Sequence, residues 1–172
     1  MKLQVYLFAM ALTGMSSCSV RDDFYNLDSD YRPELLTRPE LEKAIKFVPP
    51  REFVNVIATA ENSNYRFLVD LYQRIHVVDL NKAGSPEIKF MIVPGCTKIS
   101  RSGNSITFNS GVDLVTADIS TMDTLSITNR QRNALNELLP PDLHVIPDYA
   151  SMNSPKSKRP ANTIIVGWTL RK

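Results

Sequence analysis

The N-terminal end of this chain constrains everything after it, because it separates a leader from the part that has to fold. Residues 5–15 are mostly apolar and follow the positive charge of Lys2. A helix rises about 1.5 Å per residue and needs roughly 20 apolar residues to cross a bilayer, so this run is too short to span one. The pattern is typical of a secretory signal peptide. We expect residues 1–17 to be removed, which leaves 155 of the 172 residues for a single small domain.

The junction at Cys18 indicates how the mature chain begins once the leader is removed. Residues 15–18 (Met-Ser-Ser-Cys) place one medium-sized apolar residue and two small residues directly before the cysteine. This segment resembles the lipobox of bacterial lipoproteins. The resemblance implies that lipid, palmitate included, is attached to Cys18 and holds the protein on a membrane. The alternative is a soluble secreted protein that is cleaved after Ser17 or Ser19, in which Cys18 is incidental.

Two features beyond Cys18 bear on the destination of the protein. Ser19 stands where the resembled proteobacterial lipoproteins that stay in the inner membrane carry Asp, which implies the cell outer membrane. Residues 21–23 (Arg-Asp-Asp) resemble the surface-export signal of Bacteroidetes lipoproteins, with a solvated charged linker as an equal alternative. The expected location is therefore the outer membrane, on its periplasmic face or at the cell surface.

Charge is nearly balanced over the whole chain and uneven along it. The 20 Lys and Arg against 18 Asp and Glu give a net charge of +2, so no global field favours nucleic acid, and we expect no nucleic-acid partner. Acidic residues gather in 22–42, whereas 156–172 is basic. Residues 18–36 lack an apolar period and are interpreted as an acidic tether, followed by a globular domain over 37–172.

Three segments are candidates for helices. The first begins with the spacing of a capping box at residues 37–40 (Thr-Arg-Pro-Glu) and ends before the prolines at 49–50. The second is capped by Thr128 and ends before Pro140. Residues 65–80 fit either a helix or a strand that pairs back on the segment before it, and the pattern favours the helix slightly.

The other ordered segments are predicted as strands, because they are rich in β-branched and alternating apolar residues. The clearest is a hairpin at 97–108, with Gly103 and Asn104 in its turn. The remaining strands are expected at 53–60, 88–93, 112–119, 143–146 and 163–170, and residues 148–161 form a loop. Without regular alternation of strands and helices, the pattern predicts an α+β fold: a mostly antiparallel sheet with two or three helices in a single small domain.

Two further features are expected in the core. The last strand presents a row of apolar residues on one face, with the other face partly exposed. That row is Ile164, Val166, Trp168 and Leu170. Cys96 is expected to be a small buried residue, since no partner remains for it within the chain once Cys18 carries lipid.

Few residues suggest chemistry. His76 and His144 are the only histidines, and neither has a His or Cys at metal-ligand spacing, so we expect no metal. The chain has no Gly-x-Ser-x-Gly elbow, phosphate-binding loop or dinucleotide fingerprint, so we expect no cofactor and assign no catalytic residue. Each histidine has an aspartate near it in sequence, Asp79 and Asp142, and a small hydrolase stays open as an alternative function.

The best candidate for a binding site is a basic loop near the C-terminus. Lys156, Lys158 and Arg159 lie in a Pro- and Ser-rich segment suited to an anionic partner, and Tyr149 adds apolar contact area. The alternative is a solvated loop without a partner. Because catalytic patterns are missing, the sequence favours a lipid-anchored, non-catalytic binding or assembly module that docks a protein or an envelope polymer.

Overall fold

A computed structural model describes residues 28–84 and 86–172. In that part of the chain, the structure has eleven strands in three antiparallel sheets, one α-helix and a short 3-10 helix, η2 (Asp148–Ala150). The predicted signal peptide, Cys18 and residues 19–27 of the predicted tether lie outside the described residues.

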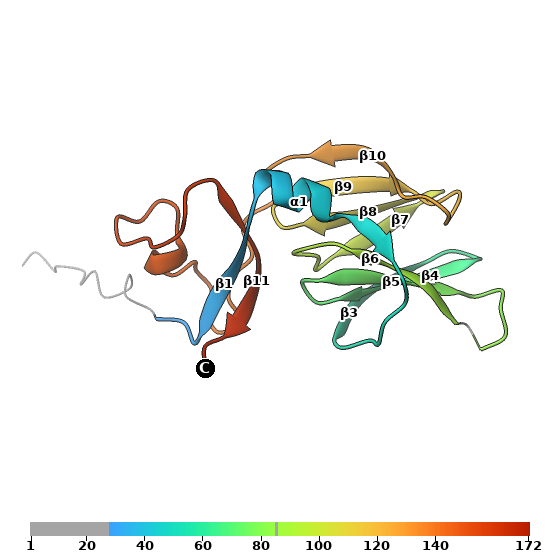
Figure 1. Cartoon of the computed structure of the whole chain (residues 1–172), viewed down its shortest axis with the longest axis horizontal. Coiled ribbons are helices and arrows are strands. Elements are labelled where there is room, and N and C mark those ends of the chain that lie inside the picture. The colour runs from blue at the N-terminus through green and yellow to red at the C-terminus, as the bar shows by residue number, and fades with distance from the viewer. Residues whose placement is uncertain (1–27, 85) are drawn as a thin grey trace, which may run out of the picture.

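Two of the sheets stack face to face as a β-sandwich (Figure 1). The larger sheet has the strand order β2-β6-β5-β4-β3, and the smaller one has the order β10-β9-β8-β7. The strands of the larger sheet are β2 (Lys46–Val48), β3 (Val56–Glu61), β4 (Tyr65–Asp70), β5 (Arg74–Asp79) and β6 (Glu87–Ile92). Those of the smaller sheet are β7 (Ile99–Ser102), β8 (Ser105–Ser110), β9 (Asp113–Asp118) and β10 (Ser126–Gln131).

The core of the sandwich lies between the two sheets. Successive side chains of a strand point to opposite faces, so alternate residues of β4, β5, β8 and β9 meet in the middle. The buried apolar residues there form one continuous cluster of 14 members. They are Ile45, Phe67, Val69, Ile75, Val77, Met91, Val93, Cys96, Ile106, Phe108, Val115, Ala117, Ile119 and Met122. This apolar burial is the main source of stability in the sandwich.

The chain passes from the larger to the smaller sheet through residues 93–98, and two residues shape this crossing. Gly95 has a φ of +75°, and a Cβ there would lie 2.5 Å from a backbone nitrogen of the neighbouring loop. The buried side-chain amide of Asn109 donates to the Gly95 carbonyl at 2.7 Å. The Asn109 side-chain oxygen accepts hydrogen bonds from the N–H groups of Thr97 and Lys98 at 2.9 and 2.8 Å. These bonds satisfy backbone groups that no strand pairs.

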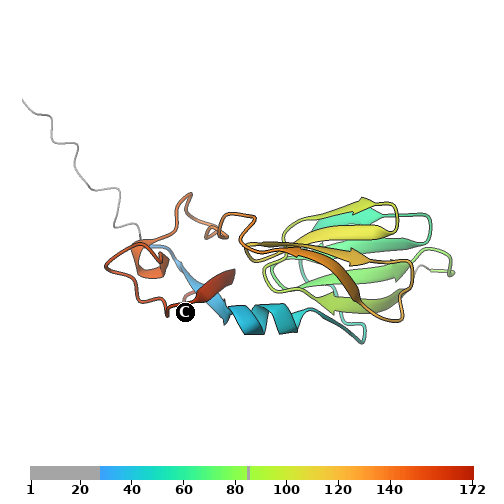
Figure 2. The same cartoon turned by 90° about the horizontal axis from the view of Figure 1, so that it is seen from above.

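The third sheet belongs to a projection that we call the arm, residues 28–37 and 132–172. It pairs β1 (Tyr31–Thr37) antiparallel with β11 (Thr163–Leu170). The helix α1 (Arg38–Ala44) connects β1 to the sandwich, and the arm projects to one side of the sandwich (Figures 1 and 2).

The arm has small apolar clusters in place of one large core. One lies where the arm meets the sandwich and consists of Leu41 of α1, Val112 between β8 and β9, and Ile164 and Val166 of β11. The other lies within the arm and consists of Ala150, Ile165 and Trp168. The burial predicted for Trp168 is confirmed, and its Nε1 donates to the carbonyl of Leu138 at 2.9 Å. The prediction of one exposed face is wrong, since β11 is buried on both faces from Ile164 to Trp168, whereas Leu170 is 57 % exposed.

A buried carboxylate joins the arm to the sandwich at the start of β9. Both oxygens of Asp113 accept hydrogen bonds from the Arg38 guanidinium of α1 at 2.6 Å, and one accepts from Arg130 of β10 at 2.8 Å. Burial alone would raise the pKa of Asp113, but the bonds from Arg38, Arg130 and the Asn133 N–H outweigh it and hold the pKa below its ordinary value. The charged form of Asp113 is therefore the one that ties α1 to the smaller sheet.

The predicted α+β class is wrong, because the described part of the chain is mostly β and its one α-helix has seven residues. Residues 65–80 form β4 and β5, so the strand alternative is confirmed and the helix is not. The alternation that would have identified these strands is obscured, because β5 is buried on both faces over most of its length. A strand covered on both sides has no period of two in its hydrophobicity.

Two more predicted elements are not formed. Residues 126–131 are strand β10 at the edge of the smaller sheet, in place of the helix expected after Thr128. Nearly all side chains of β10 are exposed, so pairing with β9 decides its conformation and no apolar pattern marks it. The strand expected at 143–146 is a loop that leaves His144 and Val145 exposed.

The predicted hairpin and the predicted capping box at Thr37 are confirmed. β7 and β8 form the expected hairpin, in which Gly103 takes a φ of +58°. The Glu40 carboxylate accepts hydrogen bonds from the N–H and the hydroxyl of Thr37, at 2.8 and 2.7 Å, as the capping-box spacing predicts. The helix ends at Ala44, earlier than expected, because residues 46–48 pair with β6 as β2.

The other predicted segments agree with the structure in outline. The strands expected at 53–60, 88–93, 112–119 and 163–170 correspond to β3, β6, β9 and β11. Residues 148–161 form a loop that contains only the short helix η2. Residues 31–36 of the predicted tether belong to β1, since β11 supplies a partner strand that the local sequence does not reveal.

Candidate functional site

The predicted basic loop does not bring its side chains together. The side chain of Arg159 is only 1 % exposed and forms an ion pair with Glu137 at 2.6 Å. It also donates to the carbonyl of Ala150 at 3.3 Å and to the hydroxyl of Thr163 at 3.2 Å. Arg159 therefore holds the arm loops against β11 and does not face a partner.

The other residues predicted for that site have separate surroundings. The Tyr149 hydroxyl donates to the carbonyl of Tyr31 at 2.6 Å, so this residue also serves the arm. The ammonium of Lys156 lies 3.9 Å from Asp148, beside a shallow hollow of about 350 Å³. Lys158 is exposed in the same loop. Two exposed lysines are what remains of the predicted cluster.

Neither histidine pairs with the aspartate near it in sequence. His144 is exposed, and the Asp142 carboxylate accepts a hydrogen bond from the Asp30 N–H at 2.7 Å. His76 is completely buried, with Nδ1 2.8 Å from Glu87 and Nε2 3.5 Å from Asp70. The two carboxylates flank opposite nitrogens and do not converge on one point. Within the described residues, no group of three or more His, Cys, Asp or Glu side chains is placed to hold a metal.

Cys96 is a buried structural residue, as predicted. Its side chain belongs to the sandwich core and has no exposed surface. Burial raises the pKa of the Cys96 thiol to about 12, so the thiol is protonated at neutral pH. A protonated, enclosed thiol is neither a nucleophile nor accessible for an intermolecular disulfide.

The outer face of the larger sheet is partly covered by a segment that the topology forces across it. β2 and β3 follow each other in the chain but lie at opposite edges of the sheet. We call residues 49–55, which join them, the crossing segment. Within it, the Phe53 ring lies 4.3 Å from the His76 ring, and the Asn55 N–H donates to Asp70 at 2.7 Å. These contacts bury His76 under the segment.

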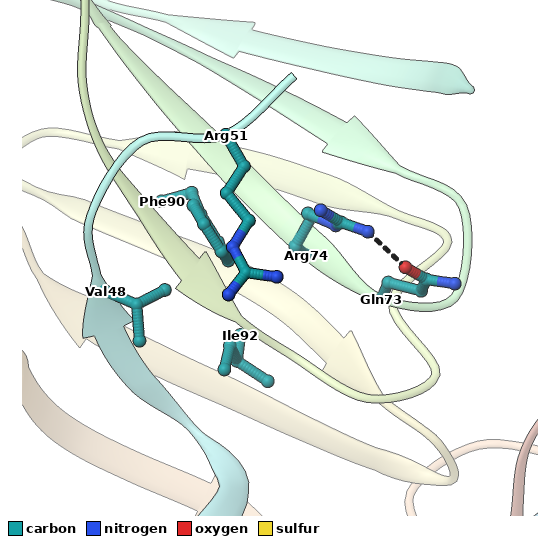
Figure 3. A pocket seen from close by; sticks show the side chains of 6 residues that line it. All are labelled: Val48, Arg51, Gln73, Arg74, Phe90 and Ile92. Carbon is teal, nitrogen blue, oxygen red and sulfur yellow. Dashed lines mark hydrogen bonds between the residues drawn. The ribbon is translucent and has the colours of Figure 1, made fainter. Parts of the chain in front are cut away.

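A hollow of about 230 Å³, the arginine hollow, lies where the crossing segment leaves β2 (Figure 3). Its lining residues are Val48, Arg51, Gln73, Arg74, Phe90 and Ile92. Figure 3 shows Arg51 reaching into the hollow from the crossing segment. The Cζ atoms of Arg51 and Arg74 lie 5.9 and 5.5 Å from the centre of the Phe90 ring, which is cation–π distance. The hollow thus combines an apolar floor with two guanidinium groups.

The two arginines of the hollow differ in how their charge is compensated. The Nε of Arg74 lies 3.5 Å from the Asp70 carboxylate, and its Nη2 donates to Gln73. Arg51 is exposed, and among the described residues it forms no ion pair; its guanidinium lies over the Phe90 ring. Its positive charge is therefore open to a ligand.

A strip of exposed apolar side chains continues from the hollow along the crossing segment into β3. We call residues 53–57 the apolar strip. Phe53, Val54, Val56 and Ile57 are 48, 77, 43 and 42 % exposed. Single exposed apolar residues are ordinary, but four large ones within five successive residues indicate a candidate interaction site.

Sequence reasoning missed this site because it assigned all of residues 53–60 to one strand. The strand begins only at Val56, and the residues before it lie across the face of the sheet. One signal was present in the sequence. Apolar residues at 53, 54, 56 and 57 do not alternate with polar ones as a half-buried edge strand requires.

No protein-family model, curated protein or solved structure matches this chain. Over residues 28–84 and 86–172, no helix is both long and apolar enough to cross a membrane. The candidate site is accordingly defined by the geometry of the arginine hollow and the apolar strip.

Proposed function

We propose that this chain is a lipid-anchored protein of the cell envelope and that its sandwich is a non-catalytic binding or assembly module. The Met-Ser-Ser-Cys junction supports an anchor at Cys18, and Ser19 supports the outer membrane. The binding role is carried by one observation: beside the apolar strip, the guanidinium of Arg51 has no ion-pair partner among the described residues. Such a surface is suited to a partner that brings both charge and apolar area.

The histidines give no support to the alternative of a small hydrolase. His76 is sealed beneath Phe53 and held between two carboxylates, so its ring cannot reach a substrate. His144 is exposed, but Asp142, its neighbour in sequence, is engaged by the hydroxyl of Ser29 at 2.7 Å. The proposed partner is therefore a protein or an envelope polymer that is bound and not cleaved.

The anchor is tested by intact-mass measurement of the protein extracted from membranes. We expect added lipid on Cys18, because several acyl chains, each contributing about 0.8 kcal/mol per buried CH₂, make attachment effectively permanent. Cys18→Ala should release the protein or leave the leader uncleaved. A membrane-extracted protein without added lipid would contradict the anchor.

The binding role is tested by affinity purification of the full chain from detergent-solubilised envelope. We expect a partner in stoichiometric amount, and we expect Val54→Asp to lose it, because Val54 is the most exposed member of the apolar strip. Val145→Asp is the matched control, a valine that is 49 % exposed on the arm. A clean monomer, or equal loss of the partner in both variants, contradicts the assignment of the binding role to the strip.

The membrane face is tested by protease treatment of intact cells. Cleavage of the sandwich alongside known surface proteins places it outside, as the Arg21-Asp22-Asp23 segment suggests. A protected sandwich places it on the periplasmic face and removes the export role of that segment.

A further inference from the structure

We infer that the arginine hollow binds a carboxylate that stands next to an apolar side chain on a partner polypeptide. This inference rests on the proposed binding function and names the ligand class of the same face.

The charge argument begins with the geometry of the guanidinium. Arginine presents several N–H donors in a planar fork that matches the two oxygens of a carboxylate. Arg74 already uses its Nε and Nη2 on Asp70 and Gln73, whereas Arg51 has no carboxylate within the described residues. Arg51 is therefore the guanidinium whose fork is open to an anion, and Arg74 adds a second positive charge to the lining.

The apolar lining argues against a small hydrophilic anion. Val48 and Ile92 flank the hollow, and the Phe90 ring lies beneath both guanidinium groups. Phosphate would satisfy the charge and leave these walls in contact with water. A volume of about 230 Å³ has room for one apolar side chain beside the charged group. A carboxylate carried next to a Leu-like side chain fits both halves of the lining.

The apolar strip argues for a polypeptide as the carrier. A free amino acid would fill the hollow and leave Val54, which is 77 % exposed, uncovered. A chain that continues from the hollow along the crossing segment would cover Val54 and Ile57 as well. Continued contact of this kind adds apolar burial without further charge.

Two short peptides test the ligand class on the full lipidated chain in non-ionic detergent. N-acetyl-Ala-Leu carries a C-terminal carboxylate, and N-acetyl-Ala-Leu-amide has the same shape without the charge. Ligand-observed NMR titration should give at least roughly tenfold weaker binding for the amide, the effect expected when one charge-assisted contact is lost. N-acetyl-Glu-Leu-amide, with its acid on the side chain, distinguishes an internal acidic residue from a chain end as the source of the carboxylate.

Arg51→Gln should remove the preference for the carboxylate, and this variant is safe for folding because Arg51 is exposed. Arg66→Gln is the matched control, an exposed arginine on β4 that does not line the hollow. Equal binding of acid and amide, or an unchanged preference in Arg51→Gln, overturns the inference. Binding of digalacturonic acid in place of all three peptides overturns the polypeptide and assigns the hollow to an acidic sugar.

Failure of this inference is separable from failure of the proposed function. If Arg51→Gln retains the stoichiometric partner that wild type retains, the binding module stands and the hollow is not its site. If wild type captures no partner but still prefers the carboxylate peptide, the hollow stands and the assembly role falls.

Discussion

The sandwich and the arm are held together in different ways. The sandwich has one apolar cluster of 14 buried residues, whereas the arm has a cluster of three and shares a cluster of four with α1 and the β8–β9 turn. The arm compensates with polar ties, chiefly the Arg159–Glu137 ion pair and the hydrogen bond from Trp168 to Leu138. Apolar burial scales with area, so the sandwich has the larger reserve of stability.

This difference shows that one short chain can carry regions of unequal stability. The arm depends on β1 and β11, which come from opposite ends of the described chain and lack a large core of their own. Regions with few buried apolar contacts open locally before the whole protein unfolds. We therefore expect the arm to open while the sandwich, with its candidate binding face, stays folded.

The largest expected effect is that of Trp168→Ala. Replacing a large buried aromatic residue by alanine costs about 3–5 kcal/mol, and here it also leaves the Leu138 carbonyl without its donor. Native-state hydrogen exchange should show loss of protection in β1 and β11, with β4 to β6 still protected. Equal loss of protection in both regions would mean that arm and sandwich unfold as one unit, and the comparison would fail.

Tryptophan emission provides an independent check on the same residue. Trp168 is the only tryptophan, and it is 6 % exposed, so wild type should emit at short wavelength. A red-shifted emission, together with an unchanged denaturant midpoint in Trp168→Ala, would place this side chain in water.

The second effect concerns the junction between arm and sandwich, which we define by the contacts of Asp113 and its neighbours. Here Asp113→Asn should lower the free energy of unfolding by about 3 kcal/mol. The substitution leaves Arg38 and Arg130 without their shared carboxylate, and removing one partner of a buried ion pair is strongly destabilising. Denaturant melts at neutral pH measure the loss. A change below about 1 kcal/mol would show that the junction is not held by this charge.

The difference in free energy of unfolding between wild type and Asp113→Asn should also depend on pH. The pKa of Asp113 is lower in the folded protein than in the unfolded chain, so its contribution to stability is present above the unfolded pKa and is lost as pH falls through the folded one. The gap between wild type and Asp113→Asn should therefore narrow below about pH 4. A gap that stays constant down to about pH 2 would contradict the lowered pKa.

The smallest effect is expected for Arg132→Ala, which also removes an ion pair at the junction. Arg132 bonds Glu42 at 2.8 Å, but its side chain is 63 % exposed. Exposed ion pairs contribute about 0–1 kcal/mol, so the unfolding midpoint should hardly move. A loss as large as that of Asp113→Asn would mean that the number of ion pairs, and not their burial, sets the strength of the junction.

The sequence predicted features that depend on neighbouring residues. The capping box at Thr37, the turn at Gly103 and the burial of Trp168 follow from local spacing or side-chain type, and the structure confirms them. Prediction from the sequence failed where pairing with a distant strand decides the conformation. β10 has no apolar period and becomes a strand by pairing with β9, and β1 does so by pairing with β11.

The prediction of a binding site at the basic loop failed for the same reason. Arg159 and Tyr149 looked accessible because their partners, Glu137 and Tyr31, are distant in the chain. Arg51 drew no attention because the hollow forms only when the crossing segment passes over β6. The sequence shows which side chains can carry charge, but it does not show which partners neutralise that charge.

The position of α1 between β1 and β2 has a mechanical consequence. In a protein held at its N-terminal side, a partner that pulls at the arginine hollow transmits the force through β1, α1 and β2 in series. β1 is already extended, so α1 is the element that can lengthen, from about 1.5 to about 3.4 Å per residue. Its seven residues would act as a short extensible link, held by Arg38 and the buried Leu41, and would lengthen once these contacts were released.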